Sequence, residues 1–153
     1  MTVQLKRTLI MKYTDIVNKI VASGIAVRYQ ERPRVFVGGK RISAAAYANI
    51  SWSDPYIVMS KRLSGGGDRA IFILLHELAH ITAIHTGRDV DEAAEECIAD
   101  TIATQLFNDI LPNGNIKEAT RRMSYEMVDF DDTVSMIEVV RGYHKAREIL
   151  ELK

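Results

Sequence analysis

The chain has 153 residues, and its 47% hydrophobic content is enough for the core of one globular domain spanning residues 1–153. Its 20 lysines and arginines balance 20 aspartates and glutamates, so the sequence has no large positive surplus and predicts no direct binding to nucleic acid. The single cysteine, Cys97, excludes an internal disulfide and agrees with a reducing, cytoplasmic compartment.

The first predicted element is an amphipathic helix at residues 5–20. Apolar residues recur in it at spacings of three and four, and Ser23-Gly24 marks its end. Lysines, an arginine and an aspartate interrupt the segment, so it contains no apolar stretch long enough for secretion or for spanning a membrane. We therefore expect no membrane partner.

A strand-rich region follows this helix. Residues 25–30 and 34–37 are rich in β-branched side chains, and Gly38-Gly39 predicts a turn after them. Two more strands are predicted at residues 45–52 and 56–61. Together these segments predict a small antiparallel sheet.

The next predicted helix opens at Asp68 and carries the run His76-Glu77-Leu78-Ala79-His80. With about 3.6 residues per turn, His76 and His80 project from one face and can share a metal ion, while Glu77 points about 100° away, beside the ion. Imidazole is a good zinc ligand, and zinc lowers the pKa of a bound water far enough for a carboxylate to accept its proton. The pattern therefore predicts two Zn²⁺ ligands and a general base.

A helix rich in carboxylates is predicted at residues 89–110. Glu96 is the preferred third ligand, because Asp100 lies one turn later, where it can accept the free N–H of a ligating histidine, and because alanines on the same side allow close helix packing. Glu92, one turn before Glu96 on the same face, is the alternative ligand. Glu95 is rotated away by about 100°.

Two C-terminal helices are predicted at residues 116–127 and 133–150. Peptide hydrolysis generates an oxyanion, which a histidine, tyrosine or arginine donor usually helps to stabilise. The last helix offers Tyr143 and His144 as candidate donors, with Arg141 as a further one, and Tyr125 is a candidate in the helix before it. The residues leave the choice among them open.

The pattern His76-Glu77-x-x-His80, followed on the next helix by Glu96-x-x-x-Asp100, resembles the gluzincin group of zinc metallopeptidases. Within that group, the chain is most similar to the small ImmA/IrrE-like metallopeptidases. These are intracellular enzymes, many of them encoded by phages and mobile elements, and several act on a DNA-binding repressor. The resemblance covers residues 56–107. It implies a minimal zincin-like fold and a sheet edge, at residues 56–60 or the neighbouring strand, that holds an extended substrate.

We therefore expect a single α+β domain that acts as a zinc-dependent endopeptidase on a protein or peptide substrate, such as a regulatory or repressor protein. Glu77 would accept a proton from the water that attacks the scissile carbonyl. The alternative is a catalytically silent, zinc-bound protein with a metallopeptidase fold that binds a partner or regulates it. The intact Glu77 argues against this alternative, because a site that only bound zinc would need no base there.

Overall fold

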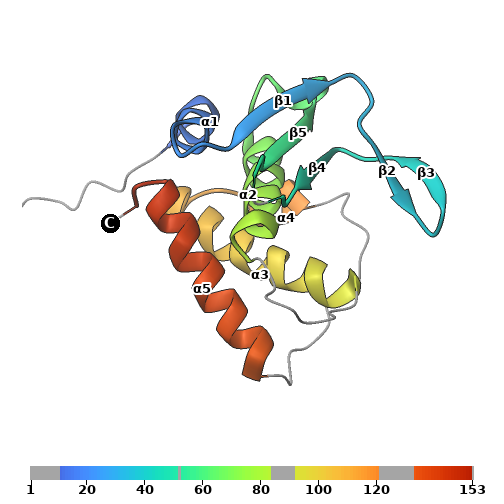
Figure 1. The fold of residues 1–153 in the computed structure, drawn as a ribbon. Coiled ribbons are helices and arrows are strands. Elements are labelled where there is room, and N and C mark those ends of the chain that lie inside the picture. Colours follow the sequence, from blue (N-terminus) through green and yellow to red (C-terminus); the bar gives the residue numbers. More distant parts are fainter. Residues whose placement is uncertain (1–10, 52, 84–91, 121–132, 153) are drawn as a thin grey trace, which may run out of the picture.

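The computed structural model describes residues 11–51, 53–83, 92–120 and 133–152 (Figure 1). Its helices are α1 (Tyr13–Ala22), α2 (Asp68–Thr82), α3 (Glu92–Ile110), α4 (Ile116–Thr120) and α5 (Thr133–Ile149). Its strands are β1 (Ala26–Gln30), β2 (Arg34–Val37), β3 (Lys40–Ser43), β4 (Ala46–Asn49) and β5 (Tyr56–Ser60), and the 3-10 helix η1 (Lys61–Leu63) follows β5. The predicted α+β class is confirmed.

The sheet differs from the prediction in its strand directions. Three strands form a mixed sheet in the order β1-β5-β4, in which β1 runs parallel to β5 and β4 runs antiparallel to it. Strands β2 and β3 pair only with each other, as an antiparallel ribbon. The prediction of one antiparallel sheet is therefore wrong. The chain between β1 and β5 contains β2, β3 and β4. It is therefore long enough to bring β5 back beside the first residue of β1, as a parallel pair requires.

The β2–β3 ribbon extends away from the helices (Figure 1). Its two strands are joined by Gly38 and Gly39, whose φ angles of 58° and 79° lie in the left-handed region that glycine adopts without strain. The predicted turn is thus confirmed. Strand β3 was not predicted, because all four of its residues are exposed and its sequence has no apolar alternation strong enough to indicate a strand.

Helix α2 is the centre of the fold. It contacts β4 and β5 of the sheet, and it also packs against α3, α4 and α5. Residues 70–79 are all buried, so this helix has no solvent-exposed face along its middle. The predicted metal-binding motif is consequently held inside the protein.

The first helix is shorter than predicted. It begins at Tyr13, and the backbone N–H of Lys12 donates a hydrogen bond to the Asp15 carboxylate at 3.0 Å, which caps the first turn. Residues 5–10 of the predicted helix lie outside the described residues, as do residues 89–91 and 121–127 of the two later ones. The predicted starts of α2 and α5 are confirmed. Within the described part of the chain, no helix is both long and apolar enough to cross a membrane.

Gly142 allows α5 to approach two other helices closely. A Cβ atom at this position would lie 2.7 Å from Cδ1 of Ile102 on α3 and 3.2 Å from Cβ of Ala83, which caps the end of α2. Both neighbours are buried, so neither has free space to move into. Any side chain larger than hydrogen at residue 142 would therefore push α5 away from α2 and α3.

We expect Gly142→Ala to destabilise the protein by about 1 kcal/mol, because an overpacking cost of about 1–3 kcal/mol exceeds the gain of about 1 kcal/mol in helix propensity. Urea unfolding of both proteins measures the difference. Gly65→Ala is the matched control, since a Cβ there meets no atom within 4 Å and its φ is not positive. A more stable Gly142→Ala protein would show that α5 does not pack as closely as described.

Candidate metal centre

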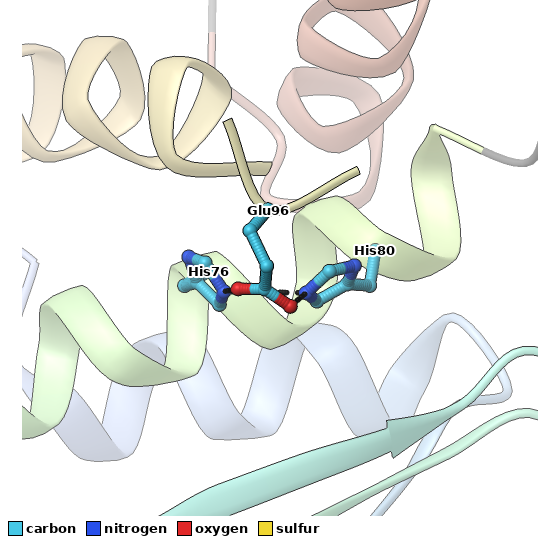
Figure 2. A group of neighbouring side chains, drawn as sticks. All are labelled: His76, His80 and Glu96. Carbon is cyan, nitrogen blue, oxygen red and sulfur yellow. Dashed lines mark hydrogen bonds and ion pairs between the residues drawn. The ribbon is translucent and has the colours of Figure 1, made fainter. Parts of the chain in front are cut away.

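Three predicted ligands meet between α2 and α3. Figure 2 shows the Glu96 carboxylate lying between the imidazoles of His76 and His80. One of its oxygens is 2.9 Å from Nε2 of His76, the other is 3.1 Å from Nε2 of His80, and the two Nε2 atoms are 3.2 Å apart. All three ligand atoms lie within 4.8 Å of one another. The preference for Glu96 as the third member of the group is thus supported by its position.

Small residues let the two helices come together at this point. Ala99 and Ala103 on α3 are buried, with exposed fractions of 1% and 0%, and α3 packs against α2. Because alanine side chains are short, the backbones can approach until a glutamate on α3 reaches histidines on α2. The alanines noted in the sequence therefore explain why Glu96 reaches the site.

The charges at the site favour a bound cation. Burial raises the pKa of Glu96, but hydrogen bonds from His76 and His80, together with their charges, outweigh it and hold that pKa well below its usual range. Burial lowers the pKa of His80, but the hydrogen bond to Glu96 and the charge of Glu77 outweigh it and raise that pKa overall. The carboxylates thus attract positive charge, which protons on the histidines or a metal ion can supply.

Glu77 is buried beside this group, with 8% of its surface exposed. Burial raises the pKa of its carboxyl, the charges of His76 and His80 lower it, and the charge of Glu96 raises it, so that the net shift is upward. A carboxylate whose pKa lies above the usual range accepts protons more readily near neutral pH. The predicted base therefore has the environment that its role requires.

The donor set can hold a metal ion. Two imidazole nitrogens and one carboxylate oxygen suit zinc in a site with an open fourth position, and they would also accept cobalt, manganese or iron. Among the residues that the structure describes, this is the only cluster of three or more histidine, cysteine or acidic side chains with such geometry.

No protein-family model, curated protein or solved structure shows a significant similarity to this chain. The chain's own residues and the geometry of the site are therefore the only indications of its function.

The two other acidic candidates on α3 have different positions. Asp100 is buried, with 8% of its surface exposed, one turn after Glu96. This position agrees with a role in orienting a ligating histidine, which stays a prediction. Glu92, the alternative ligand, is the first residue of α3, and its side chain lies outside the described part of the chain. Glu95 is not a member of the ligand group, as its rotation on the helix predicts.

The predicted oxyanion donors in α5 lie elsewhere. The hydroxyl of Tyr143 donates a hydrogen bond to the Asp109 carboxylate, which also accepts one from Arg147 at 2.7 Å. Asp109 follows Glu96 by thirteen residues on α3, which is about 20 Å along the helix axis at about 1.5 Å per residue. The structure therefore gives no support to Tyr143 as an oxyanion stabiliser, because its hydroxyl is fixed far from the ligand group.

His144 has an exposed side chain whose ring centre lies 5.5 Å from that of Tyr143. Its role as an oxyanion stabiliser stays a prediction. The remaining candidate outside the last helix, Tyr125, lies outside the described residues. Helical periodicity could not reveal that Tyr143 binds Asp109. It indicates on which face of a helix a side chain lies, but not which neighbouring helix packs against that face.

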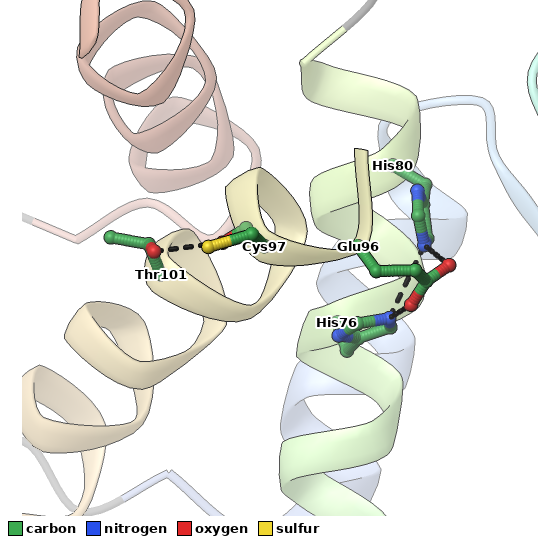
Figure 3. Close-up of polar contacts among 5 residues, drawn as sticks. All are labelled: His76, His80, Glu96, Cys97 and Thr101. Atoms are coloured by element: carbon green, nitrogen blue, oxygen red, sulfur yellow. Dashed lines mark hydrogen bonds and ion pairs between the residues drawn. The ribbon is translucent and has the colours of Figure 1, made fainter. Parts of the chain in front are cut away.

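Cys97 takes no part in the ligand group. Figure 3 shows its sulfur on the side of α3 that points away from the histidines, although it is the next residue after Glu96. The side chain is buried, and its backbone carbonyl accepts a hydrogen bond from the Thr101 hydroxyl at 2.7 Å. Cys97 therefore has a packing role.

We expect zinc to stabilise the protein by linking α2 to α3. Free zinc at about a thousand times its Kd adds roughly 4 kcal/mol to the free energy of unfolding. For a chain of this size that corresponds to a rise in Tm of roughly 8–16 °C. Differential scanning calorimetry with and without zinc, after removal of metal with a chelator, measures this shift.

The same experiment on His76→Ala tests whether the shift arises at this site. The variant should lose the zinc-dependent rise in Tm while it keeps a cooperative unfolding transition. An equal rise in wild type and variant would place the bound zinc somewhere else on the protein.

Proposed function

We propose that this protein is a zinc-dependent metallopeptidase that hydrolyses a peptide bond in a protein or peptide substrate. The observation that carries the proposal is the convergence of His76, His80 and Glu96 beside the buried carboxyl of Glu77. A site that served packing alone would bury His76 and Glu77 at a considerable cost in free energy. Metal-assisted hydrolysis, with Glu77 as the base beside the ion, would account for this arrangement.

In this proposal, His76, His80 and Glu96 would hold the ion. A bound zinc ion would supply a Lewis acid for the scissile carbonyl and would lower the pKa of a water beside it. Glu77 accepts the proton of that water and then donates it to the leaving amine. The position of Glu77, next to His76 in the chain and buried beside the ligand group, agrees with both steps.

The substrate strand would bind to β4. Strand β5, which the resemblance offered as one of two candidate edges, has β1 on one side and β4 on the other, so its hydrogen-bonding groups are already used. In the described part of the chain, β4 is paired on one side only, and it packs against α2, which carries the motif. An extended peptide could add to its open edge and present a carbonyl to the metal.

The arrangement supports the gluzincin resemblance, and we propose a minimal zincin-like fold of the ImmA/IrrE-like kind. The support is that the glutamate ligand comes from the helix after the motif and lies on the same side as both histidines. A regulatory or repressor protein is the substrate class that this resemblance implies.

Replacing the base should separate catalysis from metal binding. We expect Glu77→Gln to lower the rate of cleavage of a labelled general protein substrate at least a hundredfold, because contributions of general acid–base catalysis are on the order of 10²–10⁴. Its zinc content, measured by elemental analysis, should remain close to that of the wild type. Undiminished proteolysis in this variant would mean that another group accepts the proton.

Replacing the third ligand should instead lower the zinc content of the protein. We expect Glu96→Ala to contain much less zinc than the wild type after identical purification, since only two imidazoles remain to hold the ion. Glu95→Ala is the matched control on the same helix, and it should keep its zinc. A full zinc complement in Glu96→Ala would move the third ligand to Glu92. Full zinc without proteolysis in the wild type would instead favour the partner-binding alternative.

A further inference from the structure

The three-stranded sheet has one face in the core and one outside it. Side chains alternate along each strand, and those of Ile57 and Met59 belong to the core beside α2. The strand register places the following residues on the opposite face: Arg28, Gln30, Tyr47, Asn49, Tyr56 and Val58. We call this set the outer face. It carries two aromatic rings and an arginine but no carboxylate.

Contacts on the outer face hold its aromatic side chains in place. The Arg28 guanidinium lies 4.3 Å from the centre of the Tyr56 ring, and Gln30 donates a hydrogen bond to the Tyr47 hydroxyl at 3.4 Å. Val58, which lies between Arg28 and Tyr47 in the register, is only 1% exposed although it is not part of the main core. The Arg28 side chain on this face is exposed, and Tyr47 and Tyr56 are partly exposed.

The β2–β3 ribbon presents the same combination of side chains. Phe36 is 72% exposed, and the Arg41 guanidinium lies 5.9 Å from its ring centre. Arg34 occupies the same face of the ribbon two residues earlier, because side chains alternate along the strand. The ribbon therefore presents an exposed aromatic ring with a cation beside it.

The ribbon is attached firmly to the sheet. The backbone N–H of Ala44 donates to the carbonyl of Pro33 at 2.9 Å and closes the base of the ribbon. The N–H of Ser60, at the end of β5, donates to the carbonyl of Ala45 at 2.8 Å. Figure 1 shows the ribbon leaving the end of β1 and returning into β4. The ribbon and the outer face are therefore parts of one framework.

Charge is distributed unevenly along the chain. Residues 32–53 include Arg32, Arg34, Lys40 and Arg41 and contain no aspartate or glutamate. Because the whole chain has 20 basic and 20 acidic residues, the rest of it has 16 basic and 20 acidic ones. The balanced total thus combines a segment of charge +4 with a remainder of −4. The nearest acid before the segment, Glu31, lies 3.9 Å from Lys61, which offsets its charge.

We propose that the outer face and the ribbon together bind single-stranded nucleic acid, either RNA or DNA. Unpaired bases stack on the exposed ring of Phe36, on Tyr47 and on the guanidinium of Arg28 that lies over the Tyr56 ring, and the other cations of the ribbon neutralise phosphates. The sequence-based expectation of no nucleic-acid binding rested on the total charge, and the separation of charge within the chain removes that argument.

Single-stranded nucleic acid fits this surface better than an acidic peptide does. An acidic peptide would be attracted by the cations, but it would leave three partly or fully exposed aromatic rings without a purpose. Bases have flat faces that match such rings, and their linking phosphates match the arginines next to them. In duplex nucleic acid the bases are stacked on one another and unavailable to the rings. Both the aromatic and the cationic side chains are thus used only by a single strand.

The test uses the full-length protein with fluorescein-labelled oligo(dT) and oligo(rU), and fluorescence anisotropy gives Kd for each. We expect binding that weakens as salt rises from about 50 to about 200 mM. Phe36→Ala should weaken it roughly five- to a hundredfold through the loss of one stacked base. Met136→Ala is the matched control, because Met136 is 57% exposed on α5, and it should bind like the wild type.

A second pair of variants tests the phosphate contacts. Arg34→Ala should reduce the slope of log K against log salt by about 0.7, whereas Lys145→Ala, an exposed cation on α5, should leave it unchanged. Tighter binding of oligo(rU) or of oligo(dT) identifies the natural class. The proposal is overturned if neither oligonucleotide binds at low salt, if Phe36→Ala and Arg34→Ala bind like the wild type, or if a duplex or polyglutamate competes as well as the single strands.

Discussion

Charge compensation inside the protein is the constraint on which this structure depends. The middle of α2 is buried on all sides, yet it carries the His76 imidazole and the Glu77 carboxyl, and the partly exposed imidazole of His80 follows directly after it. Groups of this kind are costly to bury unless a partner of opposite charge lies close by. Glu96 provides that partner from α3, within 3.1 Å of both His76 and His80. The same contacts that a metal ion would replace therefore also hold the two central helices together.

The remaining helices maintain this arrangement from outside. Helix α5 crosses close to α3 and the end of α2 at Gly142, where there is no room for a side chain. Farther along, Tyr143 and Arg147 both bind the Asp109 carboxylate and fix α5 to α3. Tyr143 is a candidate for catalysis when the helix is considered by itself. Its hydrogen bond to Asp109 instead links α5 to α3, away from the candidate metal ligands.

The two faces of the sheet carry different kinds of side chain. Its inner face packs against α2 and positions the helix that carries the motif, whereas its outer face and the attached ribbon gather aromatic and cationic side chains. The acidic residues that balance the ribbon lie in other parts of the chain. A total charge of zero therefore does not describe the charge of any one surface, because electrostatic attraction in salt solution depends on local charge at distances of about 10 Å or less.

Helical spacing in the sequence was enough to predict the helix that carries His76, Glu77 and His80, and the carboxylate-rich helix after it. The reason is that the spacing alone fixes which side chains share a face of a helix. The sequence also identified Glu96, since the alanines beside it predict close packing. Only the tertiary structure decided that β1 and β5 are parallel, that β3 pairs with β2, and that Tyr143 binds Asp109. These features arise from contacts between segments distant in the chain, and local periodicity does not specify which segments meet.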